Sequence, residues 1–463
     1  MVQWLKQKAA KPQLAGGDDV QRRVEEMLGT IRAGGEEAAL RYARELDGFQ
    51  GSTEDVLVLE EEFAAAEARL PEQVKADIRV AHAAIKEFAQ AQAGTQTDLR
   101  MSSGSYPGMV AGHRMVPVDC AGCYAPGGRF AHAASVLMTV TTAKAAGVRK
   151  VILTAPPRQD TGRIHDGMLY AAKVAGADHV LTLGGVQGLA ALAFGLFTGG
   201  TRANILVGPG NRFVVAAKTL LFGEVGIDLV AGPTEVCVLA DGTADPELVA
   251  TDLVGQAEHG FDSPCVLITT SRAVADAVLA RIPALLADLQ AAEPETAACV
   301  AWRDYGLVAL CESREEMCVL SDEVASEHLQ VQCARSELEW YHARLRNYGA
   351  LFLGEETNVS YGDKAAGPNH VLPTRGAGKY TGGLNVGCFL KRAPCRARRR
   401  RRAVNPAPPF PTANPQRPPT QPTTPIGRAL ISADRRPARR AAACRGDRAH
   451  IAARRDGGAR ALG

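Results

Sequence analysis

The sequence has few aromatic residues and no long apolar run. Aromatic side chains make up 5% of its 463 residues, although 46% are hydrophobic, which is enough for a large core in two or three domains. No stretch approaches the roughly 20 apolar residues that cross a bilayer, and residues 1–6 do not begin an apolar signal peptide. We therefore expect a soluble, cytoplasmic protein without a membrane partner.

Paired cysteine motifs are almost absent as well. The 11 cysteines are scattered, some of them in β-type runs such as 236–238, where a thiol is most simply a small buried hydrophobe. Cys120 and Cys123 form the one C-x-x-C motif, which has no second pair for a zinc knuckle and does not open a helix. We favour a structural role for them over redox or metal chemistry.

Charge is unevenly distributed along the chain. Residues 391–463 hold 19 Lys and Arg against 3 Asp and Glu, whereas residues 1–390 hold 34 against 47. The basic segment contains an arginine run at 398–402 and a Pro-rich stretch at 406–425, without apolar periodicity. We predict that 393–463 is a disordered basic tail.

Two explanations of this tail stay open. A polybasic segment could bind nucleic acid through phosphate charge, although no aromatic or groove-reading element accompanies it, which argues against nucleic acid as a partner. A composition rich in Ala, Arg, Pro and Gly is also typical of a shifted reading frame in GC-rich DNA.

Apolar spacing predicts a helical start followed by two α/β domains. Residues 18–48 and 72–93 have helical spacing, and from about residue 116 short apolar runs alternate with helical segments across glycine turns. This alternation is typical of parallel sheets covered by helices. The expected strands are 149–154, 179–183, 204–207, 235–239, 264–269, 307–311 and 351–353. The expected divisions are a helical arm (1–110), two α/β domains (111–235 and 236–375), a return segment (376–392) and the tail.

Gln256 and His259 follow an expected helix at 246–254. A spacing of three residues puts an amide oxygen and an imidazole on one side of a helix, where they could hold half of a metal site. Taken alone, such a pair is more often a solvated face.

Three glycine turns lie where expected strands give way to helices, at 126–128, 184–188 and 208–211. Backbone N–H groups and a helix N-terminus at such turns can bind a phosphate group. None of the turns is the G-x-G-x-x-G fingerprint, so ordinary α/β turns remain the more frequent explanation.

Two further stretches offer acid/base groups. Glu327 and His328 are adjacent, so their side chains point in different directions and could serve different protons at different steps. The Gly- and Pro-rich loop 362–374 presents Asp363 and His370, whose oxygens and nitrogens suit a zinc ion with room for substrate. The alternatives are a surface Glu with a satisfied His, and residues that only cap turns.

Taken together, these motifs resemble the histidinol dehydrogenase family from about residue 20 to residue 392. The resemblance rests on Ala231–Glu235, Gln256–Gly260, Ser326–Leu329 and Gly367–Thr374 in the family's order and approximate spacing. It implies a homodimeric enzyme that uses zinc and NAD, with two incomplete Rossmann-like domains, the first of which binds NAD. Such enzymes oxidise a primary alcohol to a carboxylate through an aldehyde, in two hydride transfers.

The resemblance also assigns residues to the site in four groups. These are the zinc ligands Gln256, His259 and Asp363, the NAD contacts Tyr124, Gln187 and Asn211, the acid/base pair Glu327 and His328, and the substrate contacts Thr234 and His370. Histidinol enzymes usually have Ser at the position of Thr234.

The resemblance also bears on the substrate and on the completeness of the site. The stretches 368–376 and 380–384 are more similar to the branch of the family that oxidises sulfopropanediol than to the histidinol branch. Arg375 and Lys379 could offer charge to an anion or could be solvated loop charges. The family has a further Glu and a zinc-ligating His on a C-terminal helical domain, whereas here only His450 follows, without matching context. The alternative function is therefore a catalytically impaired member that keeps the fold and nucleotide binding.

Overall fold

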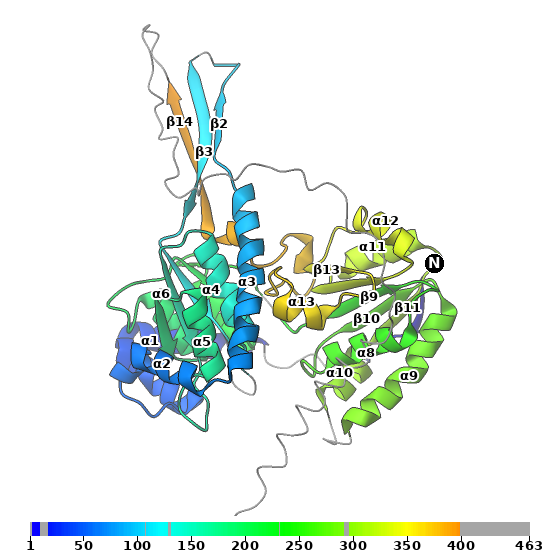
Figure 1. Ribbon diagram of the computed structural model, residues 1–463, viewed down its shortest axis with the longest axis horizontal. Coiled ribbons are helices and arrows are strands. Elements are labelled where there is room, and N and C mark those ends of the chain that lie inside the picture. The colour runs from blue at the N-terminus through cyan, green and yellow to red at the C-terminus, as the bar shows by residue number, and fades with distance from the viewer. Residues whose placement is uncertain are drawn as a thin grey trace, which may run out of the picture. The chain divides into compact units, whose positions relative to one another are not determined.

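The computed structural model of the chain describes residues 2–9, 17–106, 108–127, 131–230, 232–290 and 296–398 (Figure 1). Most of the expected basic tail, residues 399–463, lies outside the described residues. None of the helices in the described ranges combines the length and apolar character that a membrane crossing requires.

The first parallel sheet has the strand order β6-β5-β4-β7-β8. Its strands are β4 (Cys120–Tyr124), β5 (Lys150–Ala155), β6 (His179–Thr182), β7 (Ile205–Val207) and β8 (Gly226–Ile227). Counted along the chain, this is the order 3-2-1-4-5 of a Rossmann-like sheet. Its topological switch point, where such sheets bind ligands, therefore lies at the carboxyl ends of β4 and β7.

Helices cover both faces of this sheet, because its strands are apolar on both sides. One apolar core joins the sheet to α2 (Glu60–Arg69), α3 (Glu72–Thr95), α4 (Ala133–Ala145) and α5 (Asp166–Ala175). The other core joins it to α1 (Gly17–Tyr42), α6 (Gly185–Phe194) and α7 (Arg212–Leu221). The helix expected at 18–48 is confirmed as α1 and the short π-helix η1 (Ala43–Asp47), and that expected at 72–93 as α3.

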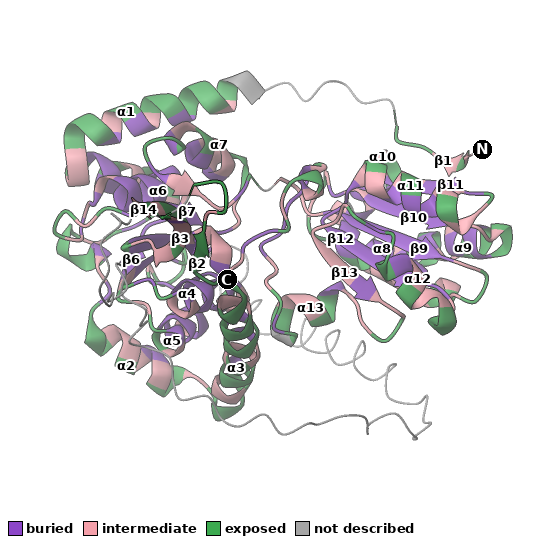
Figure 2. Ribbon diagram, turned by 90° about the horizontal axis from the view of Figure 1, so that it is seen from above, coloured by how far each residue is buried: buried purple, intermediate pink, exposed green. Residues whose placement is uncertain are grey.

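The second sheet has the order β1-β11-β10-β9-β12-β13 and is parallel except for β1. Its strands are β1 (Gln3–Lys6), β9 (Val236–Ala240), β10 (Cys265–Thr269), β11 (Leu307–Leu310), β12 (His328–Gln332) and β13 (Ala350–Leu353). One face packs against α8 (Pro246–Ala257), α9 (Arg272–Gln290) and α10 (Ala297–Tyr305), and the other against α11 (Arg314–Val324) and α12 (Leu338–His342). Figure 2 shows its strands as a buried layer between exposed helix faces.

These two sheets with their flanking helices confirm the predicted α/β class. Short helices complete the described chain: η2 (Glu54–Val56), η3 (Arg335–Glu337), α13 (Val359–Ala365), η4 (Ala377–Lys379) and η5 (Val386–Phe389). The expected domain boundaries at residues 111, 235 and 375 stay a prediction.

The sequence did not predict β1. Its four residues, QWLK, are too few to show a strand pattern. Lys6 Nζ donates to the carbonyl oxygens of Gly306 at 2.9 Å and Arg303 at 3.3 Å, at the end of α10. These bonds hold the strand against the edge of the sheet.

A third, antiparallel sheet of order β14-β3-β2 was also missed (Figure 1). It consists of β2 (Leu99–Ser102), β3 (Met109–Pro117) and β14 (Leu390–Arg398). Residues 393–398 are therefore part of a strand, and the predicted disorder of this segment is wrong. The physical reason is that β14 pairs with β3 along its whole length, so backbone hydrogen bonds order a basic stretch that has no apolar pattern.

A buried ion pair fixes the turn after β7. Gly208 has a φ of 120°, and a Cβ on it would lie 2.1 Å from the carbonyl oxygen of Tyr124, so only glycine fits. Asp228 accepts the Gly208 N–H at 2.7 Å, while Lys218 Nζ donates to the Gly208 carbonyl at 3.0 Å and pairs with Asp228. The side chains of Lys218 and Asp228 are 3% and 0% exposed.

Replacing Lys218 should therefore be costly. We expect K218M to lower the free energy of unfolding by about 3–5 kcal/mol, because Asp228 would be left buried without its counter-charge. Urea denaturation measures the change. The matched control is K144M, which removes a pair with Asp178 whose side chains are 28% and 37% exposed, and should cost at most about 1 kcal/mol. Equal small losses in both variants would contradict the prediction.

Candidate active site

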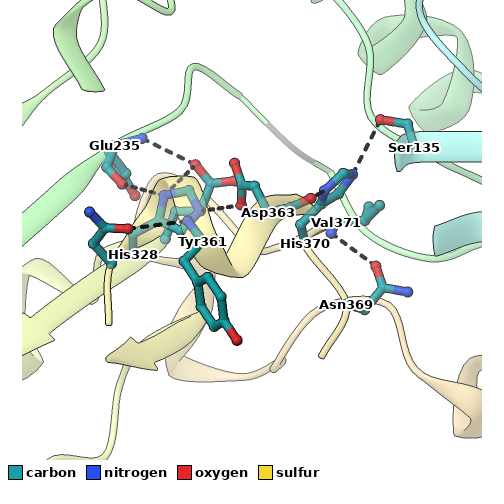
Figure 3. A network of polar contacts seen from close by, with 10 residues as sticks. Ser135, Glu235, His328, Tyr361, Asp363, Asn369, His370 and Val371 are labelled. Carbon is teal, nitrogen blue, oxygen red and sulfur yellow. Dashed lines mark hydrogen bonds and ion pairs between the residues drawn. The ribbon is translucent and has the colours of Figure 1, made fainter. Parts of the chain in front are cut away.

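His328 lies at the amino end of β12, where one ring nitrogen contacts a backbone carbonyl and the other faces Asp363 (Figure 3). Its Nδ1 is 3.2 Å from the carbonyl oxygen of Glu235. A carbonyl only accepts, so Nδ1 carries the hydrogen and Nε2 holds the lone pair of the neutral ring. Nε2 is buried and lies 3.5 Å from Asp363 Oδ1, with which it forms an ion pair when the ring is protonated.

Glu327 adds a second buried titratable group. Its Oε2 lies 3.8 Å from His328 Nδ1 and accepts the backbone N–H of Glu235 at 3.1 Å. Burial raises the pKa of Glu327 to about 8. Burial lowers the pKa of His328, but the carboxyl groups of Glu327 and Asp363 raise it by more, so it lies above its usual value. The pair therefore holds more protons near neutral pH than it would in the unfolded chain.

Glu235 is a site residue that the sequence reasoning missed. Its carbonyl orients His328, while its carboxyl Oε1 accepts the N–H of Arg375 at 2.9 Å. Burial raises the pKa of this carboxyl. Glu235 therefore connects His328 to the loop after α13. The available sequence signal was its place directly after Thr234 in the motif Ala231–Glu235.

The three candidate zinc ligands come from two elements. Gln256 is in the last turn of α8, 3% exposed, with Nε2 unpaired among the described residues; His259 follows that helix, and Asp363 lies on α13. The charge of Asp363 acts on the pKa of His259, so these two groups are near each other.

Their protonation states fit a metal. Desolvation lowers the pKa of His259 although the residue is exposed, which favours a neutral imidazole. Burial raises the pKa of Asp363, but His328 lowers it by more, which favours a carboxylate. Metal ligands bind in these forms, and the amide, imidazole and carboxylate set suits zinc with open positions. Among the described residues, no cluster of three or more His, Cys, Asp or Glu side chains could hold a metal ion. Gln256 is not one of these residue types, so a set that includes it is not counted among such clusters.

The two expected substrate contacts differ in their surroundings. His370 has both ring nitrogens engaged, with Nδ1 donating to the Asp363 carbonyl at 2.7 Å and Nε2 lying 3.2 Å from Ser135 Oγ on α4 (Figure 3). A substrate group would have to displace Ser135 to reach it. Thr234 is partly exposed and directly precedes the buried Glu235. Two residues before Thr234, the backbone N–H of Gly232 donates to Thr374 Oγ1.

The expected NAD contacts gather near the switch point of the first sheet. Tyr124 ends β4, is 4% exposed, and its hydroxyl accepts the Gly185 N–H at 3.4 Å. Gln187 is 1% exposed, and its Nε2 donates to Asp47 Oδ2 at 2.7 Å. Asn211 instead caps α7, its Oδ1 accepting from two backbone N–H groups of that helix at 3.0 and 3.2 Å. Asp47 was missed, because nothing in the sequence relates it to a residue 140 positions away.

The C-x-x-C cysteines have no reactive character. Cys120 and Cys123 are buried in β4, and both are free thiols. Burial raises the pKa of Cys120 to about 11 and that of Cys123 further. Raised thiol pKa values disfavour the thiolate, which supports their structural role.

A sequence model of the histidinol dehydrogenase family matches residues 11–405. The chain belongs to this family. Membership makes it an oxidoreductase, and the site described above lies within the matched range.

Individual members of the histidinol dehydrogenase family are similar over most of their length. The sulfopropanediol 3-dehydrogenase of Ruegeria pomeroyi is 51% identical over 84% of this chain and 87% of its own. The histidinol dehydrogenase of Parasynechococcus marenigrum is 38% identical over 84% and 86%. The crystal structure of histidinol dehydrogenase from Elizabethkingia anophelis matches with a TM-score of 0.75 and 29% identity over 85% and 87%.

The raised pKa of Glu327 predicts how stability depends on pH. An acid whose folded pKa exceeds its unfolded value keeps a proton in the folded state, so stability is present at low pH and is lost as pH rises through the folded value. We expect the metal-free protein to lose stability between about pH 5 and pH 8, since the pKa of Glu327 rises from its ordinary value of 4.5 to about 8. The raised pKa of His328 acts in the same direction.

The variant E327Q should flatten this dependence, because glutamine does not ionise and removes the charge that raises the pKa of His328. Urea midpoints from pH 5 to pH 8, measured after chelation of metal, test it. The control is E339Q at a residue whose side chain is 93% exposed, which should behave like wild type. A slope that is unchanged in E327Q would refute the role of burial.

Proposed function

We propose that this chain is a zinc- and NAD-dependent dehydrogenase that oxidises a primary alcohol to a carboxylate in two steps. The observation that carries the proposal is the buried imidazole of His328, held through Nδ1 by the Glu235 carbonyl and with Nε2 facing Asp363 at 3.5 Å. In its neutral form such a ring, fixed in one tautomer, can take a proton from a bound hydroxyl.

His328 would act as the base of the alcohol step. The Glu235 carbonyl holds the ring with its lone pair on Nε2, so the hydroxyl proton of the substrate would move to that nitrogen. The imidazolium that results would be stabilised by the carboxylate of Asp363, and by that of Glu327 when Glu327 is ionised, because both raise the pKa of His328.

Glu327 would act in the second step. With a pKa of about 8, it can exchange a proton near neutral pH and assist the addition of water to the aldehyde. Its 6% exposure keeps bulk water away from it, and a shielded site also retains a reactive aldehyde.

Two groups would complete the site. Gln256, His259 and Asp363 would hold zinc, which when bound supplies a Lewis acid that lowers the pKa of the substrate hydroxyl. Tyr124, Gln187 and Asn211 would contact NAD, which when bound accepts hydride. We further propose a homodimer, as the family resemblance implies.

The substrate that we favour is a small hydroxy sulfonate of the sulfopropanediol type, ahead of histidinol. Arg375 supports this choice. Its φ of 54° is uncommon outside glycine, and its bond to Glu235 ties it to the neighbour of His328. A Cβ on Gly232 would lie 2.5 Å from Arg375 Nε, so the guanidinium lies over the backbone two residues before Thr234. An exposed guanidinium at this place can bind a sulfonate.

The activity is tested with purified protein, zinc, NAD⁺ and either sulfopropanediol or histidinol, by following NADH absorbance. We expect turnover of the sulfonate, loss of activity on chelation and recovery with zinc. H328N should lower kcat by about 100-fold or more, because the base is lost. The control H342N changes a histidine whose side chain is 57% exposed and should match wild type. Bound zinc without turnover of either alcohol would contradict the proposal and favour the impaired family member.

The substrate class is tested separately by R375M. We expect KM for sulfopropanediol to rise about tenfold or more, because one charge-assisted contact is lost, with little change for the uncharged 1,2-propanediol. The variant G232A should act in the same direction, since its Cβ would displace the guanidinium. K379M, which removes a nearby exposed cation, is the control. Equal losses with both alcohols would show that Arg375 does not recognise the sulfonate.

A further inference from the structure

Asp47 joins the N-terminal helices to the first residues of α6. It is the last residue of η1, and its Oδ2 accepts both the Gly184 N–H at 2.8 Å and the Gln187 Nε2 at 2.7 Å. Position 184 has no room for a side chain beside Asp47, because a Cβ on Gly184 would lie 2.6 Å from Asp47 Oδ1. The carboxyl group is therefore built into the start of α6.

This contact determines how the Gln187 amide is oriented. An ionised carboxylate can only accept hydrogen bonds, so the NH₂ group of Gln187 must face Asp47 and its Oε1 must face away. That oxygen is buried in a residue 1% exposed and has no hydrogen-bond partner among the described residues. A buried carbonyl oxygen without a donor is costly, and it indicates a bound group that donates.

The same contact excludes a phosphate from this position. Helix N-termini commonly bind anions through their N–H groups, but Asp47 accepts from Gly184 and the Tyr124 hydroxyl accepts from Gly185. A phosphate would meet a carboxyl group where it needs N–H donors. Burial raises the pKa of Asp47, and its two N–H donors oppose that change.

We propose that Asp47 is a positioning residue that fixes Gln187 so that its Oε1 accepts a hydrogen bond from a hydroxyl or amino group of the dinucleotide. The proposal rests on the proposed use of NAD. The donor is either a hydroxyl or amino group of the ADP-ribose half or the carboxamide of the nicotinamide.

The test is NADH binding to the metal-free protein, followed by nicotinamide fluorescence without substrate. D47N keeps an oxygen that can accept both bonds, and its dissociation constant should stay within about threefold of wild type. D47L cannot orient the amide and should bind about tenfold more weakly. Q187L leaves the bond of Asp47 to Gly184 intact and should lose the same amount.

The double variant D47L/Q187L decides whether Asp47 acts through Gln187. Two residues that act as one unit are not additive, so the double variant should bind no more weakly than Q187L. Additive losses, or wild-type binding by D47L, would overturn the proposal. D47N binding as weakly as D47L would also overturn it, because charge rather than orientation would then matter. Thermal unfolding of each variant shows whether D47L still folds. If D47L does not fold, wild-type NADH binding by Q187L is sufficient to refute the positioning role of Asp47.

Repeating the titration by calorimetry with ADP-ribose shows which half of the dinucleotide carries the group that donates to Gln187 Oε1. A loss in D47L with both ligands assigns it to the ADP-ribose half, and a loss with NADH alone assigns it to the nicotinamide. With the active enzyme, D47L should raise KM for NAD⁺ and leave kcat within about threefold. Wild-type protein that does not bind NADH would refute the cofactor assignment itself, and this proposal with it; unaffected binding in D47L would refute the positioning role alone.

Discussion

The site depends on one hydrogen bond, from His328 Nδ1 to the backbone carbonyl of Glu235. The acceptor lies one residue before β9 and the donor is the first residue of β12, two strands that pair in parallel register with His328 opposite Val236. Because the register of the sheet places these atoms, the tautomer of the histidine is a property of the fold. A loop could not hold a ring nitrogen in this way without further contacts.

Burial determines the other electrostatic properties of the site. Glu327 and Glu235 have raised pKa values because protein surrounds them, whereas Asp363, which faces His328, has a lowered one. Carboxyl groups of one chemical type thus hold protons to different extents within a small volume. This separation allows one group to donate or accept a proton while another stays charged.

The sequence predicted those helices and strands whose local spacing of apolar residues matches their place in the folded core. The strands β5, β6, β7, β9, β10, β11 and β13 of the two parallel sheets were readable because each is a short, mainly apolar run. β4, β8 and β12 were not among the expected strands, and β12 alternates apolar residues with buried His and Gln. The pairing of β14 with β3 and of β1 with β11 was not readable, since both depend on backbone partners far along the chain. Glu327 and His328 were identified as adjacent titratable groups, but Glu235 acts mainly through a carbonyl, which no side-chain pattern shows. Asp47 had no signal, because its partners are distant in sequence.

The placement of β1 affects how the chain is divided between the two parallel sheets. Residues 3–6 belong to the sheet of β9–β13, the chain from α1 to β8 builds the other, and β14 ends beside β3. The polypeptide therefore passes between the sheets three times, after β1, after β8 and after α13. Neither parallel sheet, taken with the residues packed against it, is therefore built from one continuous segment of the chain. Cutting the polypeptide at a single point would not separate the sequence into one piece for each sheet.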